Sequence, residues 1–398
     1  MSPDQTNNRD SGPFTDLPSH NPGSFKEFRR IYLDNNASTP LDPLVADFIV
    51  KNLPLLQGNP SSSHSFGQAA RSLINKAKAS ISSFFGVKSS ELIFTSGGTE
   101  SVNIAIRGLI SHKPPGHIIT SSVEHSCVIA VCKLMEAQGY SVSYLPSGPL
   151  GAVQPDAVKA AIRPDTQLIV LMAVNNETGV KTDIQSIARI TQEHRIPFFV
   201  DAVSQLGKEV ILIPPGISAM AFSGHKVHAL QGIGLLYLRT GTKLQPLIFG
   251  GEQEYGRRAG TENVLGILSL SKAMELLSPA AYEGVKLLRD RFESVLLKAI
   301  PGLLINGEGA RISNVSNLAF PGVDGEALLM NLDRAGIAAS HGSACSSGSL
   351  EPSRILLGMG LPLERVNSSI RFSLSRLTTA AEIEAACATI ICLVKKQI

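Results

Sequence analysis

Residues 92–101 read LIFTSGGTES, a short apolar segment followed by a pair of glycines. The apolar side chains of Leu92 to Thr95 predict a buried strand, and the residues after Glu100 predict a helix up to about Gly108. Small residues let a backbone approach an anion, and the free N–H groups and dipole of the helix attract it. The stretch predicts a strand, a phosphate-binding turn and a helix, although a Gly-Gly turn is more often a plain connection.

The same alternation continues on both sides of this stretch. A short strand is predicted at 30–34, and further strands at 117–120, 167–173, 197–201, 219–222 and 234–238; helices are predicted from about 43 and at 67–85, 123–138 and 184–194. Compact apolar strands separated by amphipathic helices are typical of a mostly parallel sheet covered on both faces. The sequence therefore predicts an α/β fold.

The order of predicted helices and strands changes near Pro279, which interrupts a helical stretch over 262–300. Strands are predicted at 314–319, 336–339 and 370–374 in a second, smaller sheet, with helices near 325–335 and 380–396. We expect a flexible N-terminal tail over 1–29, a large domain over 30–278 whose first residues can also pack with the small domain, and a small α+β domain over 279–398.

Composition excludes some classes of partner. The 398 residues carry a net charge of +3 without a basic block, which argues against nucleic acid as a primary partner. The longest apolar runs fall short of the roughly 20 residues that a membrane helix needs, and no secretory signal is visible, so we expect neither membrane nor export. The five cysteines show no CxxC pair, which predicts no metal site and favours a reducing cytoplasm.

Two side chains that follow apolar strands carry candidate chemistry. Asp201 ends the strand 197–201 and needs a partner there; a protonated pyridine nitrogen would supply one, while a helix cap is an equally compatible role. Lys226 follows the strand 219–222 in small, partly apolar surroundings, which lower the pKa of an amine and favour Schiff-base chemistry. An isolated lysine is, however, usually a surface charge.

Sulfur chemistry is suggested by residues 339–349, which are almost all small and predict a flexible, exposed loop. Cys345 lies in this loop and is the predicted nucleophile, because an exposed thiol on a mobile segment can reach a pocket and then carry sulfur outward. The other four cysteines fall on helical patterns and are expected to be structural. Arg371 lies on an alternating strand that can present it to a substrate carboxylate, the alternative being a surface-facing arginine.

From about Ile31 to Arg376 the chain resembles the fold-type I, class V aminotransferase relatives, and within them the cysteine desulfurases of the nitrogenase and iron-sulfur-cluster type. The motifs that carry the resemblance are YLDNNA at 32–37, GNPSS at 58–62, TSGGTES at 95–101, VEH at 123–125, NNETG at 175–179, VDA at 200–202, SGHK at 223–226, GRRAGTEN at 256–263 and GSACSSG at 342–348. The resemblance implies a large domain with a mostly parallel seven-stranded sheet and a small C-terminal domain.

The resemblance also implies pyridoxal 5'-phosphate as cofactor and a role for each matching residue. Lys226 would hold the cofactor, Asp201 would pair with its ring nitrogen, and His125 would stack on the ring and move protons. Residues assigned to cofactor binding are Lys226, Gly98, Thr99, His125, Asn176, Asp201, Ser204, Ser223, Gly224, His225 and Thr261, and residues assigned to the substrate are Asn176, Arg371 and Asn35. Thr261 would act on the partner subunit's phosphate, which implies a homodimer.

The implied reaction converts L-cysteine to L-alanine and leaves sulfur as a persulfide on Cys345. An acceptor protein, such as an iron-sulfur scaffold, would then take the sulfur for cluster or other thio-cofactor synthesis. Two positions depart from the family pattern: Ser204 stands where a glutamine is usual, with Gln205 one residue late, and ALQG at 229–232 replaces GPKG. Both leave the contacts beside the cofactor open.

The sequence leaves alternative functions open. A selenocysteine lyase or another class V enzyme would use the same constellation, and the lyase can bypass the loop thiol. A non-catalytic binding partner in sulfur trafficking is a rival from another class, motivated weakly by Ser204.

Overall fold

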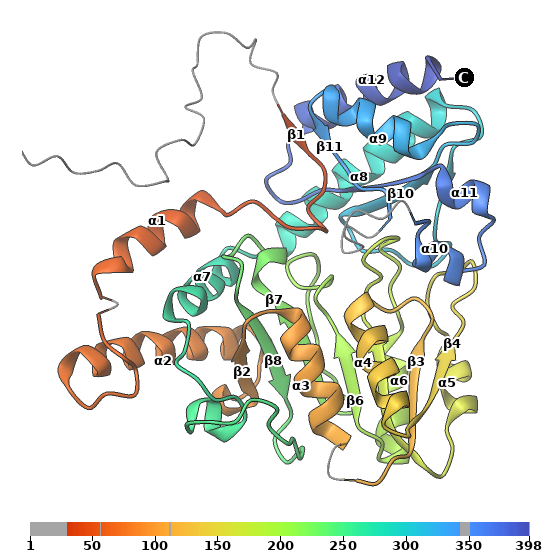
Figure 1. Ribbon diagram of the computed structural model, residues 1–398. Helices are drawn as coiled ribbons and strands as arrows, with labels where there is room; N and C mark the ends of the chain where they lie inside the picture. Colours follow the sequence, from red (N-terminus) through yellow and green to blue (C-terminus); the bar gives the residue numbers. More distant parts are fainter. Residues whose placement is uncertain (1–29, 56, 111–112, 343–350, 398) are drawn as a thin grey trace, which may run out of the picture.

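The computed structural model describes residues 30–55, 57–110, 113–342 and 351–397. The predicted tail over 1–29 and the segment that contains Cys345 lie outside the described residues. A large sheet with helices on both faces occupies one half of the molecule, and a smaller unit with its own sheet occupies the other half (Figure 1).

Within the described residues the large sheet has seven strands in the order β2-β8-β7-β6-β5-β3-β4. They are β2 (Leu92–Thr95), β3 (His117–Ser121), β4 (Ser141–Leu145), β5 (Thr166–Met172), β6 (Phe198–Asp201), β7 (Ala219–Ser223) and β8 (Gly234–Leu238). The pairs from β4 to β7 are parallel, and β8 runs antiparallel to both β7 and β2. This is the mostly parallel sheet that the sequence predicts.

Burial on both faces explains why these strands are continuous apolar runs. Successive residues of β6 enter opposite cores: Phe198 and Val200 join one cluster of buried side chains, and Phe199 joins the other. Helices α3 (Gly98–Ile110) and α4 (Ser126–Ala137) cover the Phe199 face. The other face is covered by α1 (Pro43–Asn52), α2 (Ser65–Phe85), α5 (Pro155–Ala161), α6 (Ile184–His194) and α7 (Val264–Glu275).

Local signals set several helix ends. The carboxylate of Asp42 accepts the N–H of Leu44 and caps α1, which has proline in its first turn. Helix α2 ends at Gly86, whose φ of 66° is the left-handed conformation that glycine adopts at low cost. Asp183 caps α6 by accepting the N–H of Ser186.

The smaller unit is built on a three-stranded antiparallel sheet of order β12-β10-β9. Its elements are α8 (Pro279–Ala299), β9 (Leu304–Ile305), β10 (Val315–Ala319), α9 (Gly325–Arg334), α10 (Arg354–Gly358), α11 (Leu363–Asn367), β12 (Ser369–Ser373) and α12 (Ala380–Lys395). Phe292, Phe320 and Phe372 are fully buried in its core, which also contains Ile31 and Leu33 from the start of the described chain.

The pairing predicted for residues 336–339 is wrong. This segment forms β11 (Ile337–Ala338), which pairs in parallel with β1 (Ile31–Tyr32) in a separate two-stranded sheet and meets β12 only through a bridge between Ser340 and Arg371. The pattern of apolar and polar residues in a short strand does not determine which distant segment the strand will pair with. In this case the partner comes from the other end of the chain.

Among the described residues no single helix is long and apolar enough to cross a membrane. Helices α7 and α8 meet the criteria of length and apolar composition only when taken together, across a bend of 76°.

Candidate active site

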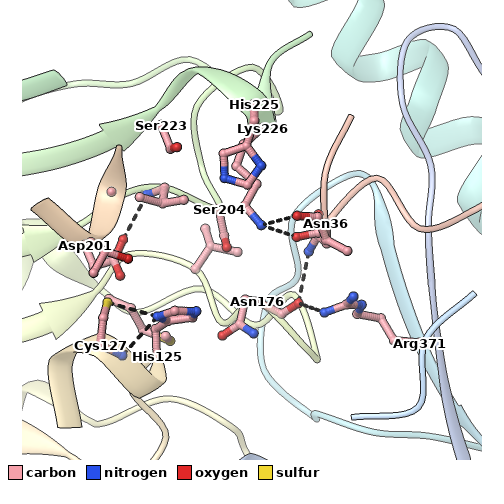
Figure 2. A pocket seen from close by; sticks show the side chains of 16 residues that line it. Asn36, His125, Cys127, Asn176, Asp201, Ser204, Ser223, His225, Lys226 and Arg371 are labelled. Carbon is pink, nitrogen blue, oxygen red and sulfur yellow. Dashed lines mark hydrogen bonds between the residues drawn. The ribbon is translucent and has the colours of Figure 1, made fainter. Parts of the chain in front are cut away.

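A cavity of about 300 Å³ lies where the carboxyl ends of β2, β3, β5, β6 and β7 meet. Ligands bind at this edge of an open α/β sheet because loops from several strands converge there. Of the residues assigned to the site from the sequence, those that line the cavity are Gly98, Thr99, His125, Asn176, Asp201, Ser204, Ser223, His225, Lys226 and Arg371. Figure 2 shows most of these side chains around one space.

The turn after β2 and the end of β7 form one end of the cavity. A Cβ atom added to Gly98 would lie 2.8 Å from Cγ2 of Val203, so this close approach requires glycine. Ser223 is buried, and its Oγ has no hydrogen-bond partner within the described residues. A buried hydroxyl without a partner is costly unless a ligand supplies one. This hydroxyl, together with the start of α3, provides donors for an anion.

Asp201 presents a buried carboxylate to the same cavity. Its Oδ1 accepts the N–H of Val203 at 3.0 Å. Burial raises the pKa of Asp201, while the nearby His125 and Lys226 lower it. A cationic group in the cavity would be stabilised by this carboxylate, because it would offset the cost of burying the negative charge.

His125 caps α4 and has a defined tautomer. Its Nδ1 accepts the backbone N–H of Cys127 at 3.2 Å and lies 2.9 Å from the thiol sulfur of the same residue. Since a backbone N–H can only donate, the neutral imidazole carries its proton on Nε2. Burial raises the pKa of the Cys127 thiol, so this thiol is a donor rather than a thiolate. Cys127 was expected to be structural only, yet it lines the cavity.

A second buried acid lies directly before His125. Glu124 is fully buried, its Oε1 accepts the hydroxyl of Ser121 at 2.6 Å, and its Oε2 has no partner within the described chain. Burial raises the pKa of Glu124 to about 8, with Asp201 adding to the shift. Glu124 is therefore predominantly protonated at neutral pH, and Asp201 is the acid of this pair that lines the cavity.

Lys226 reaches across the cavity from the short helix η3 (Gly224–Lys226). Its Nζ donates to the carbonyl of Asn36 and, at 3.0 Å, to that of Ala37 (Figure 2). His225, the preceding residue, lies with its Nδ1 3.3 Å from Oγ of Ser38. Burial lowers the pKa of His225 to about 4, assisted by the positive charge of Lys226, so this imidazole is neutral at physiological pH.

Arg371 forms the opposite wall and is almost completely buried. One of its terminal nitrogens donates to Oδ1 of Asp34 at 2.8 Å, and the other donates to the carbonyl of Asn176 at 3.2 Å. Its Nε and the side-chain Oδ1 of Asn176 have no partners among the described atoms. The surface-facing alternative for Arg371 is therefore wrong, and a guanidinium in this setting can bind a carboxylate.

The structure separates Ser204 from Gln205. Ser204 lines the cavity, whereas Gln205 lies on another cavity and donates to Oε1 of Glu209 at 2.8 Å. The one-residue displacement of the glutamine therefore turns its side chain away from the site.

Three described residues assigned to the site do not line the cavity: Asn35, Gly224 and Thr261. Asn35 turns away and donates to the carbonyl of Ser373 at 2.9 Å, while its neighbour Asn36 lies on the wall. Gly224 uses its N–H for the carbonyl of Ile233 at 2.9 Å and packs so closely that a Cβ atom would lie 2.6 Å from Ile233 Cγ2. The predicted contacts of Asn35 with substrate and of Gly224 with the cofactor stay predictions.

Thr261 is exposed and lies on a different, smaller cavity with Arg258, outside the one that contains Lys226. Cys345 is outside the described residues. The chain enters the segment that carries it just after Ser340, whose backbone pairs with that of Arg371 at 2.7 and 3.1 Å.

Six residues of the cavity wall were not predicted: Asn36, Ala37, Cys127, Met172, Val174 and Val203. Most of them end a strand or follow one within a few residues, so position relative to a strand end was the available signal. Among the described residues no group of three or more His, Cys, Asp or Glu side chains could hold a metal ion.

Known proteins are similar to this chain in sequence and in fold. The model of the aminotransferase class-V family matches residues 31–386. A cysteine desulfurase of Nostoc sp. is 45% identical over 89% of this chain and 90% of its own, and a cysteine desulfurase IscS of Methanosarcina thermophila is 42% identical over 90% of each. A solved NifS-like protein has a TM-score of 0.85 at 31% identity, covering 92% of this chain and all of its own. The structure of SspA in complex with cysteine has a TM-score of 0.79 at 33% identity, covering 88% and 100%.

Proposed function

Because this chain belongs to the class V aminotransferase family, we propose that it is a cysteine desulfurase with pyridoxal 5'-phosphate as its cofactor. The observation that carries the proposal is that Lys226, Asp201 and Ser223 line one cavity. An amine, a buried carboxylate and a hydroxyl without a partner among the described residues match the aldehyde, the ring nitrogen and the phosphate of this cofactor. Curated relatives of 42–46% identity bear the same function name.

The residues present fit the cofactor. Lys226 would hold its aldehyde carbon, Asp201 its ring nitrogen, and the turn at Gly98 and Thr99 with Ser223 its phosphate. His125 and Asn176 would bound the ring, and Ser204 and His225 lie on the same wall. When bound, this cofactor supplies an electron sink for bond cleavage at the carbons of an amino acid.

The charged groups of the chain have distinct tasks. Asp201 would keep the ring nitrogen protonated, because a carboxylate beside it favours the cationic form of the ring. Arg371 would orient the carboxylate of the substrate cysteine by bidentate hydrogen bonds, using a guanidinium already fixed by Asp34. Lys226 would take and return the proton on the substrate Cα, and His125, whose Nδ1 accepts the N–H of Cys127, would assist with a further proton transfer.

Cys345 completes the reaction in this proposal. Its thiolate attacks the sulfur of the substrate cysteine, the Cβ–S bond breaks, and the sulfur stays on Cys345 as a persulfide. The electron pair of the broken bond remains with carbon, which is protonated and leaves as alanine. L-cysteine and one enzyme thiol thus give L-alanine and one enzyme persulfide, without an external oxidant. The start of this segment beside Arg371 supports the assignment.

The sulfur would pass next to an acceptor protein, such as an iron-sulfur scaffold. We place this activity in the cytoplasm, where a reducing environment keeps the nucleophile as a thiol. The cysteines of the described residues, Cys127, Cys132, Cys387 and Cys392, are all free, which fits such a compartment.

We also propose a homodimer. Large apolar side chains are exposed near the helices α1 and α2 and in the loop after β8; they are Leu44, Val50, Leu53, Phe66, Phe249 and Tyr255. Exposed apolar side chains mark a protein interface where they lie together. Thr261 follows this loop and lies outside the cavity that contains Lys226 in the same chain, as a residue that serves the partner would. Mixing inactive Lys226→Ala and Thr261→Ala chains would restore part of the activity if the sites are shared.

The proposal is tested by the release of alanine and sulfide from L-cysteine in the presence of dithiothreitol. Wild type should form both in equal amounts, and Lys226→Ala and Cys345→Ala should form neither. Cys392→Ala is the matched control, because this thiol is exposed and far along the chain from the cavity; it should retain full activity. Turnover of selenocysteine but not cysteine by wild type, or full activity of Cys345→Ala, would contradict the proposal.

A further inference from the structure

Lys208 is a buried cation directly behind the cavity. It follows Gly207 in the turn after β6 and is only 6% exposed. Its Nζ donates to the carbonyls of Leu206 and Lys226, both at 3.4 Å, which is long for such hydrogen bonds. No ion pair within 4.0 Å involves Lys208 in the described part of the chain.

The titratable groups that face Lys208 are basic. Lys226 and His225 belong to η3, and His228 follows it. Two neighbouring acids are already paired: Glu209, the next residue in the chain, with Lys181, and Asp42, whose N–H donates to the carbonyl of His228, with Arg376. Burial, and after it the charge of Lys226, lowers the pKa of Lys208 to about 7. The same two lysines help to lower the pKa of His225 to about 4.

A purely structural lysine is a poor explanation for this arrangement. Burying an ammonium group without a counter-ion is costly, and a neutral amide could donate to the same carbonyls at lower cost. The position of Lys208 has a consequence, however, for the residue whose carbonyl it contacts. The charge of Lys226 lowers the pKa of Lys208, and because such coupling is mutual, placing a second proton on the pair is disfavoured.

We propose that Lys208 is a positioning residue for Lys226: it fixes the Lys226 backbone carbonyl and, while it carries its proton, disfavours protonation of the Lys226 side chain. An unprotonated amine is the form that attacks a carbonyl carbon. This inference rests on the proposed function, because Lys226 needs that form only if it binds a carbonyl cofactor.

The test compares Lys208→Met, Lys208→Gln and Lys208→Arg after reconstitution with pyridoxal phosphate. Methionine removes the charge and the donor, glutamine removes only the charge, and arginine keeps both. The readout is the pH at which the visible absorbance band of the lysine-bound cofactor changes. We expect Lys208→Met and Lys208→Gln to raise that midpoint by about one pH unit, as for charges several ångströms apart, and Lys208→Arg to leave it near wild type.

An unchanged midpoint in Lys208→Gln, or a shift in Lys208→Arg as large as in Lys208→Met, would overturn the inference. If a variant does not retain the cofactor, the pH dependence of acylation of Lys226 in the chain without cofactor gives the same comparison. A wild-type chain that acquires no visible band with the cofactor contradicts the proposed function instead, so the two failures are distinguishable.

Discussion

Replacing Ser223 with alanine should change cofactor affinity and stability in opposite directions. In the chain without cofactor the Ser223 hydroxyl is buried and has no partner among the described residues, a situation that costs about 1–3 kcal/mol. Alanine removes that cost, so Ser223→Ala without cofactor should be as stable as wild type or more stable by about 1 kcal/mol. With cofactor the same change removes a hydrogen bond to a charged phosphate, worth about 1.5–3 kcal/mol. The dissociation constant should therefore rise roughly 10- to 150-fold.

Two measurements are needed. Urea unfolding of the chain without cofactor gives the free energy of unfolding, and calorimetric titration with pyridoxal phosphate gives the affinity. Calorimetry suits this chain because it has no tryptophan to report binding by fluorescence.

Ser316→Ala is the matched control. Ser316 lies in β10 of the smaller unit, is fully buried, and its Oγ also has no partner within the described chain. This variant should share the effect on stability and leave cofactor affinity unchanged. The reasoning would be refuted if Ser223→Ala destabilised the chain without cofactor and kept wild-type affinity, because Ser223 would then have a structural role alone.

Three further predictions concern two residues that line the cavity, Asp201 and Arg371, and the buried acid Glu124. Asp201→Asn should retain cofactor but lower kcat by about 100-fold or more, because a neutral amide cannot hold a proton on the ring nitrogen; an unchanged kcat in the alanine assay would contradict this. Arg371→Lys should raise KM for cysteine about 10-fold with a smaller effect on kcat, since a lysine cannot form the bidentate contact, and an unchanged KM would argue against the substrate role. For Glu124, burial raises the folded-state pKa from 4.5 to about 8, so its contribution to the stability of the chain without cofactor is fully present below pH 4.5 and is lost as pH rises through about 8. Glu124→Gln, which mimics the protonated acid, should remove this part of the pH dependence in unfolding measurements; an identical pH profile would show that the carboxyl does not titrate as described.

Much of the large sheet could be predicted because burial on both faces leaves a clear pattern. The strands 92–95 and 234–238 have the predicted bounds, since all their side chains are buried. The edge strand β4 was missed because SVSYL at 141–145 is largely half-exposed and contains two serines. Strand β11 was found, but its partner was not, because pairing between residues 31–32 and 337–338 is a tertiary choice that neither segment encodes locally.

At the site, too, some features could be predicted from the sequence and others depend on tertiary packing. Motifs located Lys226, Asp201 and His125, whose chemistry depends on residue type and on a place after a strand. They could not tell Asn35 from Asn36, because adjacent residues of a turn face different ways and only packing decides which one faces the cavity. Nor could they show that Lys208 is buried beside Lys226, since lysine in a sequence normally indicates a surface.

The central claim, that Lys226 holds a carbonyl cofactor in this cavity, is tested most directly by borohydride reduction of the reconstituted chain and mass analysis of its peptides. We predict a single reduced adduct, on the peptide that contains Lys226, and none on the peptide that contains Lys208. An adduct on any other lysine, or no adduct at all, would contradict the account.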